Sequence, residues 1–133
     1  MTRLMLDSDV CIDAMRGRTP AIQRRLERVD PAETAISSIV AAELWTGVMK
    51  SRERAQGAEA VRALLGFAKV LDWPTDAAVV YAEVRAHLES VGRSIGAMDL
   101  LIAAHAIHEK AILVTRNIGE FRRVRGLRIE SWR

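Results

Sequence analysis

Cysteine and long hydrophobic runs are nearly absent from this sequence of 133 residues. Cys11 is the only cysteine, so no disulfide can form within the chain. The first six residues lack the basic start and the long apolar stretch of a secretory signal, and we expect a cytoplasmic protein. The longest apolar runs, such as 100–104, are far shorter than the roughly 20 residues of a membrane span. We therefore expect no membrane role.

Lysine is also scarce, and arginine supplies nearly all of the positive charge behind a formal net charge of +3. The planar guanidinium fork suits phosphate, which favours a polyanionic partner, although the base composition of the genome could also enrich arginine. The arginines are concentrated near the end of the sequence. The last eighteen residues contain Arg116, Arg122, Arg123, Arg125, Arg128 and Arg133.

The arrangement of apolar residues predicts an α/β fold. A hydrophobic content of 50% is enough to bury a core, and we expect 1–133 to form one domain. Short apolar segments predict strands near 4–6, 34–37, 70–71, 111–114 and 127–130. Between them, helices are predicted at 10–15, 21–29, 39–49, 51–68, 76–91 and 97–109. This alternation indicates a parallel sheet covered by helices on both faces.

Single acidic residues stand at matching places beside the predicted strands. Asp7 ends the first strand, which commonly lies next to the point where strand order reverses and ligands bind. Glu43 lies on the inward face of the helix that follows the second strand. Asp99 begins the apolar helix before the fourth strand, and Glu120 follows that strand closely. We expect these carboxylates to converge at one edge of the sheet.

Each acid also has an ordinary structural explanation when taken alone. Asp9 would cap a helix that begins near Val10, with Asp7 beside it in a loop. Asp99 would be a first-turn acid stabilised by the helix dipole. An inward Glu43 fits less easily, because a buried carboxylate needs a proton or a cation and this helix offers no basic side chain within a turn.

The acids taken together point to metal-dependent hydrolysis. Carboxylates that crowd together at pH 7 require protons or a divalent metal ion. Ligand sets made only of oxygen favour Mg²⁺ or Mn²⁺ over zinc. A metal ion held in this way polarises a phosphoryl oxygen and generates a hydroxide nucleophile at neutral pH. Phosphodiester hydrolysis is therefore the predicted chemistry.

Four motifs follow one another in a fixed order along the chain. They are Leu6-Asp7-Ser8-Asp9-Val10, Ile36-Ser37-Ser38 before Ala42-Glu43-Leu44, Ile95-Gly96-Ala97-Met98-Asp99-Leu100-Leu101-Ile102-Ala103-Ala104-His105-Ala106, and Leu113-Val114-Thr115-Arg116-Asn117 before Glu120-Phe121. Together they resemble the PIN-domain ribonucleases of the VapC toxin type. The resemblance implies a three-layer α/β/α fold, an RNA substrate, a homodimer and a VapB-type antitoxin as partner. It also implies Mg²⁺ held chiefly through Asp7 and Asp99, with Glu43 in the same cluster.

Two positions depart from the pattern of that family. Many members have a fourth acid where this chain has Asn117, so either Glu120 replaces it or the site contains three acids. Position 9 is often Asn in the family and is Asp here, which either adds a ligand or keeps a helix cap. The predicted catalytic residues are Asp7, Glu43, Asp99 and Glu120.

Other functions fit parts of the sequence. The segment 7–10 matches the nucleophile motif of haloacid-dehalogenase-like phosphatases, with Asp7 as the nucleophile, but Lys110 precedes an apolar strand and Asp99 lacks a nearby second acid. A non-catalytic RNA-binding module would lack metal-dependent RNA cleavage.

The remaining polar candidates have simpler explanations. His87, His105 and His108 lack the spacing of a helical zinc pair, and we expect them on the surface. Thr115 and Ser8 could orient a ligand carboxylate, but hydroxyls at strand ends more often cap backbone groups. The tryptophans are better explained as packing or dimer residues than as platforms for bases.

Overall fold

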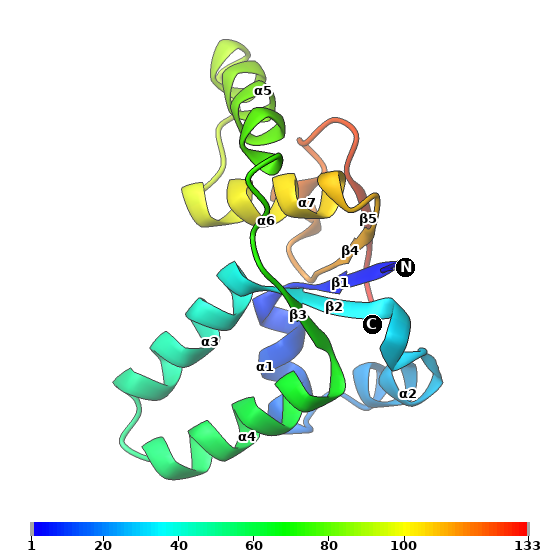
Figure 1. Cartoon of the computed structure of the whole chain (residues 1–133), viewed down its shortest axis with the longest axis vertical. Coiled ribbons are helices and arrows are strands. Elements are labelled where there is room, and N and C mark those ends of the chain that lie inside the picture. Colours follow the sequence, from blue (N-terminus) through cyan, green and yellow to red (C-terminus); the bar gives the residue numbers. More distant parts are fainter. Residues whose placement is uncertain (1, 133) are drawn as a thin grey trace.

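A parallel sheet of five strands forms the centre of the computed structural model, which describes residues 2–132 (Figure 1). Its strands are β1 (Leu4–Leu6), β2 (Thr34–Ser37), β3 (Lys69–Leu71), β4 (Ile112–Val114) and β5 (Arg128–Glu130). Their order is β3-β2-β1-β4-β5, and every neighbouring pair is parallel. Strand order reverses between β1 and β4, so residues that follow these two strands lie at the expected ligand-binding point.

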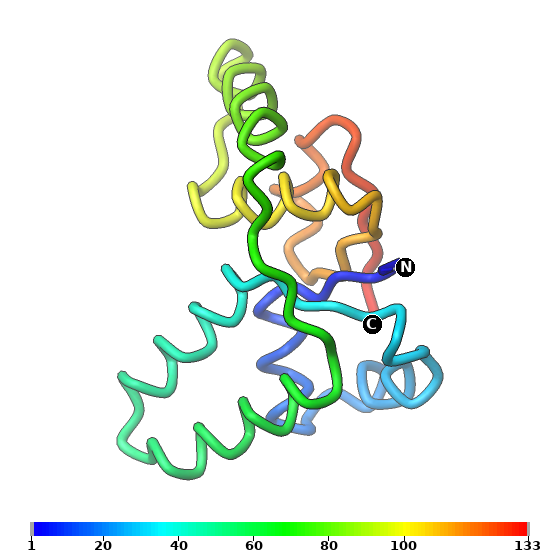
Figure 2. The backbone as a smooth tube through the Cα atoms, in the orientation of Figure 1, coloured from blue at the N-terminus to red at the C-terminus, as the bar shows by residue number. Residues whose placement is uncertain are grey.

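Helices cover both sides of the sheet and give the predicted three-layer arrangement (Figure 1). On one side lie α1 (Ser8–Arg16), α2 (Pro20–Arg28), α3 (Ser38–Lys50) and α4 (Arg54–Phe67). On the other side lie α5 (Ala77–Ser90), α6 (Ala97–His108) and α7 (Ile118–Phe121). The backbone trace in Figure 2 shows α3 and α4 running side by side as an arm that extends beyond the sheet.

The core consists of apolar side chains from the central strands and from the helices packed on them. Met5, Leu6, Leu113 and Val114 are all buried, because a parallel sheet covered on both faces leaves no solvent-facing side. Helix α6 is buried almost all round, as its apolar sequence predicts. This burial holds the start of α6 close to the ends of β1 and β4.

Helices α1 and α4 begin more than one residue away from their predicted starts. Helix α1 begins at Ser8 and its N-cap is Asp7, so the structure rules out the alternative in which Asp9 is the cap. Helix α4 begins at Arg54, not at residue 51. The hydroxyl of Ser51 accepts a hydrogen bond from the backbone N–H of Glu53 at 3.0 Å, which forms a turn between α3 and α4.

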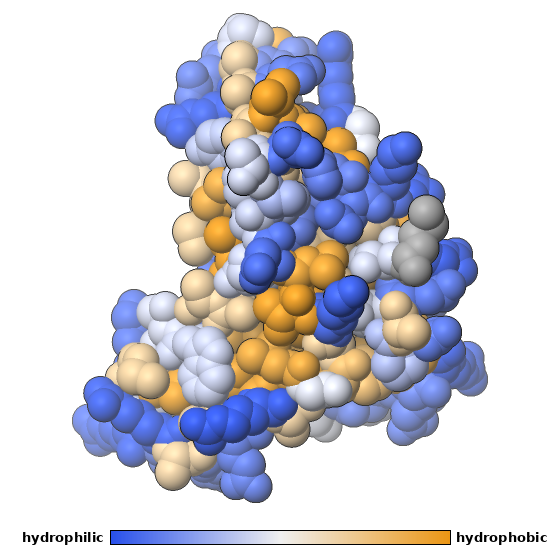
Figure 3. Space-filling view, in the orientation of Figure 1, coloured by the Kyte–Doolittle hydropathy of each residue, from blue (hydrophilic) through white to orange (hydrophobic). Residues whose placement is uncertain are grey.

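Polar side chains cover much of the visible surface, and apolar side chains gather along its middle (Figure 3). The exposed large apolar residues include Val70 on β3, Val79 on α5 and Met98 on α6. No helix in residues 2–132 combines the length and the apolar character that crossing a membrane requires.

Candidate active site

Asp7 lies at the end of β1 and is held by donors from two neighbouring segments. The hydroxyl of Thr115, which follows β4, donates to Oδ2 at 2.7 Å, and the backbone N–H of Ser8 donates to Oδ1 at 2.8 Å. Burial raises the pKa of Asp7 from 3.8 to about 6, the negative charges of Asp9 and Glu43 add to the rise, and the two hydrogen bonds oppose it. The carboxylate is therefore well oriented but costly to ionise.

Asp99 stands in the first turn of α6 and is half-buried. Burial raises its pKa from 3.8 to about 7. The negative charges of Asp7, Glu120 and Glu43 and a hydrogen bond with Glu120 all act in the same direction. Because these groups act on Asp99 through their charges, the structure brings together the four acids that the sequence singled out.

Glu43 extends from α3 into this cluster with one oxygen unsatisfied. Its Oε1 atom is buried and has no hydrogen-bond partner within residues 2–132. Burial raises the pKa of Glu43, the hydroxyl of Ser8 lowers it, and the charge of Asp9 raises it further. An unpaired buried acceptor is unfavourable on its own, and a proton or a cation would satisfy it.

Glu120 and Asn117 lie together on the short helix α7 and the turn before it. The side-chain amide of Asn117 donates to Oε2 of Glu120 at 3.2 Å. The backbone N–H of Asn117 donates to the hydroxyl of Thr115 at 3.0 Å. The structure therefore places the carboxylate of Glu120 beside Asp99. Asn117 donates a hydrogen bond to that carboxylate.

Asp9 binds the loop that follows β4. Its carboxylate accepts the backbone N–H of Arg116, at 3.3 Å to Oδ1 and 3.2 Å to Oδ2. The guanidinium of Arg116 pairs with Asp13 one turn further along α1, at 2.9 Å. Burial raises the pKa of Asp9, and the hydrogen bond from Arg116 lowers it. This contact fixes the loop that carries Thr115 and Asn117.

The arginines of the C-terminal segment divide into bound and free side chains. Arg123 donates to the backbone carbonyl of Ser94 at 3.3 Å, and Arg128 donates to that of Lys110 at 2.6 Å. Arg122 and Arg125 are exposed. The last of the predicted group, Arg133, lies outside the described residues.

Sequence reasoning misplaced one histidine and discounted one hydroxyl. His105 was expected on the surface, but it is fully buried on α6 and its Nδ1 lies 2.8 Å from Oγ of Ser37. The apolar residues around His105 in the sequence of α6 were the available signal that this side chain is buried. Thr115 was judged a backbone cap, and its hydroxyl does accept the backbone N–H of Asn117, but it also donates to Asp7. A single sequence shows that a hydroxyl group follows a strand, but it does not show to which carboxylate that hydroxyl donates a hydrogen bond.

The donor set suits a hard divalent cation. Mg²⁺ usually binds one or two protein carboxylates and completes its shell with water and substrate phosphate. Within residues 2–132, no group of three or more His, Cys, Asp or Glu side chains is placed so that it could hold a metal ion. Asp7 and Asp99 could supply the one or two carboxylates, and a nearby cation would lower their raised pKa values.

These pKa values predict how the stability of the metal-free protein depends on pH. Asp7 and Asp99 titrate near 6 and 7 when folded, against 3.8 ordinarily, so the folded state binds more protons than the unfolded state in that window. Their contribution to the free energy of unfolding must therefore fall as the pH rises from about 4 to about 7. Urea unfolding in a chelator should show Asp99→Asn gaining stability relative to wild type between pH 5 and pH 8. Parallel pH profiles for the two proteins would contradict the burial of Asp99 among other acids.

Comparison with known sequences identifies the family. The PIN domain profile matches residues 4–127. Ribonuclease VapC2 of Rickettsia felis is 41% identical over 129 residues, which cover 96% of each chain. The tRNA(fMet)-specific endonuclease VapC of Salmonella typhimurium is 34% identical over 132 residues, which cover 99% of each chain.

Comparison with solved structures supports the same family assignment. The structure of VapBC2 from Rickettsia felis, bound to a DNA fragment from the promoter, contains a chain with a TM-score of 0.92 and 37% identity, covering 99% of this chain and 100% of that one. DNA-bound VapBC from Salmonella typhimurium contains a chain with a TM-score of 0.94 and 34% identity, covering 100% of both. The predicted fold class and family resemblance are thus confirmed. The chain belongs to the PIN-domain family and, within it, to the VapC type.

Proposed function

We propose that this protein is an endoribonuclease that hydrolyses RNA phosphodiester bonds with Mg²⁺ or Mn²⁺ and acts as the toxin of a toxin–antitoxin pair. The gathering of Asp7, Glu43, Asp99 and Glu120 at the point where strand order reverses is the observation that carries the proposal. The names of the relatives support the reaction class, because both are nucleases.

Each residue of the cluster has a separate task in this proposal. Asp7 and Asp99 would hold the metal ion, which when bound polarises a phosphoryl oxygen and promotes attack by hydroxide. The hydroxyl of Thr115 orients Asp7. In the protein alone, the negative charge of Glu120 opposes the ionisation of Asp99. The unpaired oxygen of Glu43 leaves an acceptor available inside the site.

The surroundings of Asp7 argue against the phosphatase alternative. Both of its oxygens already accept hydrogen bonds, from Ser8 and from Thr115, and the side chain is only 4% exposed. A nucleophilic carboxylate must reach phosphorus directly, which a side chain this buried does not favour, whereas a small metal ion could use a remaining lone pair on either oxygen. Membership of the PIN-domain family supports the same conclusion.

The exposed arginines supply a surface for the RNA backbone. Arg122 and Arg125 follow Glu120 closely and have no ion pair among the described residues. Guanidinium groups bind phosphates without reading base sequence. We therefore assign these arginines to positioning the substrate beside the acidic cluster.

A VapB-like antitoxin is the partner that we propose, together with a homodimeric state. Solved relatives are VapBC complexes, which supports such a partner. A cavity of about 650 Å³ lies between α1, α3 and α4, and its lining includes Glu43 together with Arg16 and Arg18. An extended segment placed in this cavity would reach the acidic cluster at Glu43.

The first test replaces a proposed metal ligand. Asp99→Asn should abolish RNA cleavage without unfolding the chain, because the amide keeps the volume and removes the charge. Metal catalysis is worth several kcal/mol and each factor of ten corresponds to about 1.4 kcal/mol, so we expect a loss of roughly 100-fold or more. Calorimetric titration with Mg²⁺ or Mn²⁺ measures the lost affinity. The control is Asp72→Asn, an exposed acid. Equal metal affinity in wild type and Asp99→Asn would refute the assignment.

The second test compares Glu120 with Asn117. If Glu120 replaces the missing acid of the family, Glu120→Gln should lower cleavage by orders of magnitude. Asn117→Ala should cost less, because it removes only a donor behind Glu120. RNA cleavage rates of the two variants at saturating metal concentration, compared with wild type, measure both effects. The reverse order of effects would make Asn117 the functional residue.

The third test addresses regulation. Production of the protein alone should arrest growth, since free ribonuclease destroys RNA, and Asp7→Asn should relieve the arrest. Co-production with the product of a neighbouring small gene should also relieve it by forming a stable complex. The purified complex should not cleave RNA. A complex that cleaves as fast as the free protein would exclude inhibition by occupation of the site.

A further inference from the structure

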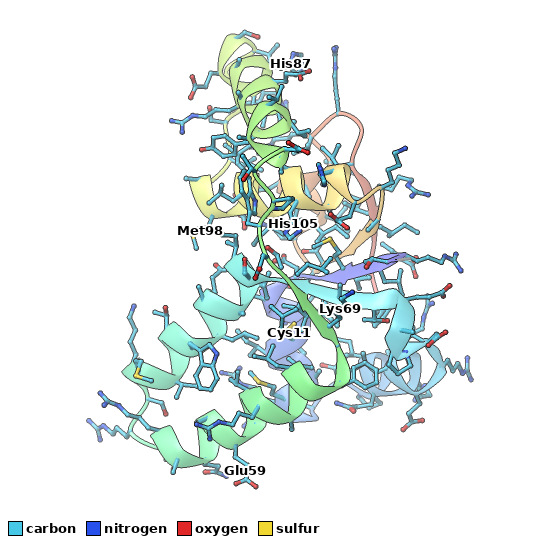
Figure 4. The ribbon with its side chains drawn as sticks, viewed as in Figure 1. Cys11, Glu59, Lys69, His87, Met98 and His105 are labelled. Carbon is cyan, nitrogen blue, oxygen red and sulfur yellow. The ribbon has the colours of Figure 1, made fainter. Side chains whose placement is uncertain are left out.

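His105 is a polar side chain in the middle of a helix that is otherwise apolar and buried. It is 0% exposed, and Figure 4 shows it below α6, on the side that faces the sheet. Its Nδ1 atom lies 2.8 Å from Oγ of Ser37, a residue 68 positions earlier in the chain that is itself 1% exposed. Burying an imidazole is unfavourable unless a hydrogen-bond partner compensates. The hydrogen bond to Ser37 therefore needs a structural or functional explanation.

The hydrogen bonds around Ser37 assign the proton on the ring. The Ser37 hydroxyl oxygen already accepts the backbone N–H of Ile39 at 3.1 Å as the N-cap of α3. If the hydroxyl donates to Nδ1, its hydrogen is satisfied and only the Nε2 atom of His105, which has no partner in residues 2–132, stays unpaired. If Nδ1 carried the proton, the hydroxyl hydrogen would be unpaired as well. The first arrangement leaves fewer unsatisfied groups, and burial lowers the pKa of His105, which keeps the ring neutral.

This bond joins the two helices that carry Glu43 and Asp99. Ser37 caps α3, which carries Glu43 one to two turns later, and His105 lies nearly two turns after Asp99 on α6. A second link runs beside the first. The backbone N–H of Trp73 donates to the hydroxyl of Ser38, and its indole N–H donates to the carbonyl of Leu101, both at 2.9 Å.

We propose that His105 is a positioning residue: as a neutral acceptor it binds the Ser37 cap and sets the placement of Glu43 on α3 relative to Asp99 on α6. Its effect on RNA cleavage rests on the proposed function, but its effect on the spacing of the acids does not. The Trp73 link restrains the outer side of the same junction, and the His105 bond restrains its buried side. The relative position of the two carboxylates then depends in part on a hydrogen bond that does not touch the substrate.

The state of the ring can be measured without any activity. Nitrogen-15 NMR of the folded protein should show His105 with a bare Nδ1 and a proton on Nε2, unchanged between pH 5.5 and pH 8. A ring with its proton on Nδ1, or one that titrates in this range, would overturn the assignment.

Substitutions separate the hydrogen bond from packing. His105→Asn places an amide oxygen near the position of Nδ1 and should keep metal affinity and kcat near wild type. His105→Gln and His105→Leu cannot place an acceptor there, and both should lose about 10-fold to 100-fold in kcat and in metal affinity with little change in KM for RNA. The stability control is Ile22→Ala on α2, a buried residue on a helix that contacts neither α3 nor α6 closely.

The outcomes are distinct. Loss in the Gln and Leu variants, beyond that of Ile22→Ala at equal thermal stability, supports the proposal, and rescue by Asn supports it further. Equal behaviour of Asn and Gln would overturn it, and this pair decides the matter even if the Leu variant does not fold. If the wild-type protein cleaves no RNA, the proposed function fails. The metal affinities of the variants and the nitrogen-15 NMR signals of the His105 ring still test the role of His105 in that case.

Discussion

Repulsion among carboxylates at one edge of the sheet is the constraint on which this site depends. Two such charges about 4 Å apart repel by roughly 4 kcal/mol at an effective dielectric constant near 20. The chain orients them with neutral donors: the hydroxyl of Thr115 holds Asp7 and the amide of Asn117 holds Glu120. The ion pairs within residues 2–132 involve other acids. The cluster is thus ordered without being neutralised, which keeps its negative charge available to a cation.

Much of the fold could be predicted because its strands and helices have distinct local patterns. The segments before Asp7 and before Thr115 are continuous apolar runs, as strands buried on both faces require, and they pair at the centre of the sheet. The start of α4 could not be predicted, because residues 51–53 suit a helix by composition. There the hydroxyl of Ser51 forms a turn, and α4 packs back against α3. Tertiary packing decides such boundaries, and local propensity does not.

The site was less predictable wherever a residue acts through a distant partner. The acids themselves could be found, since each stands at a strand end or a helix start. The role of Asp9 stayed open between a ligand and a helix cap, because its partner, the N–H of Arg116, lies 107 residues away. His105 was misjudged because helical spacing tests only for a zinc pair, whereas its partner Ser37 ends strand β2 and caps another helix. Sequence periodicity shows which face a residue occupies, but it contains no information on contacts between elements.

Asn117 and Glu120 form one hydrogen-bonded pair at the edge of the acidic cluster. The family resemblance leads us to expect an acid where Asn117 stands, and the nearby carboxylate belongs to Glu120, three residues later on α7. An aspartate at position 117 could not donate to Glu120 as the amide does, and it would add a charge to a cluster in which the pKa of Asp99 is already raised. The two residues are therefore coupled. Restoring the family's acid at 117 alone would increase repulsion, and it becomes favourable only if Glu120 is neutralised at the same time.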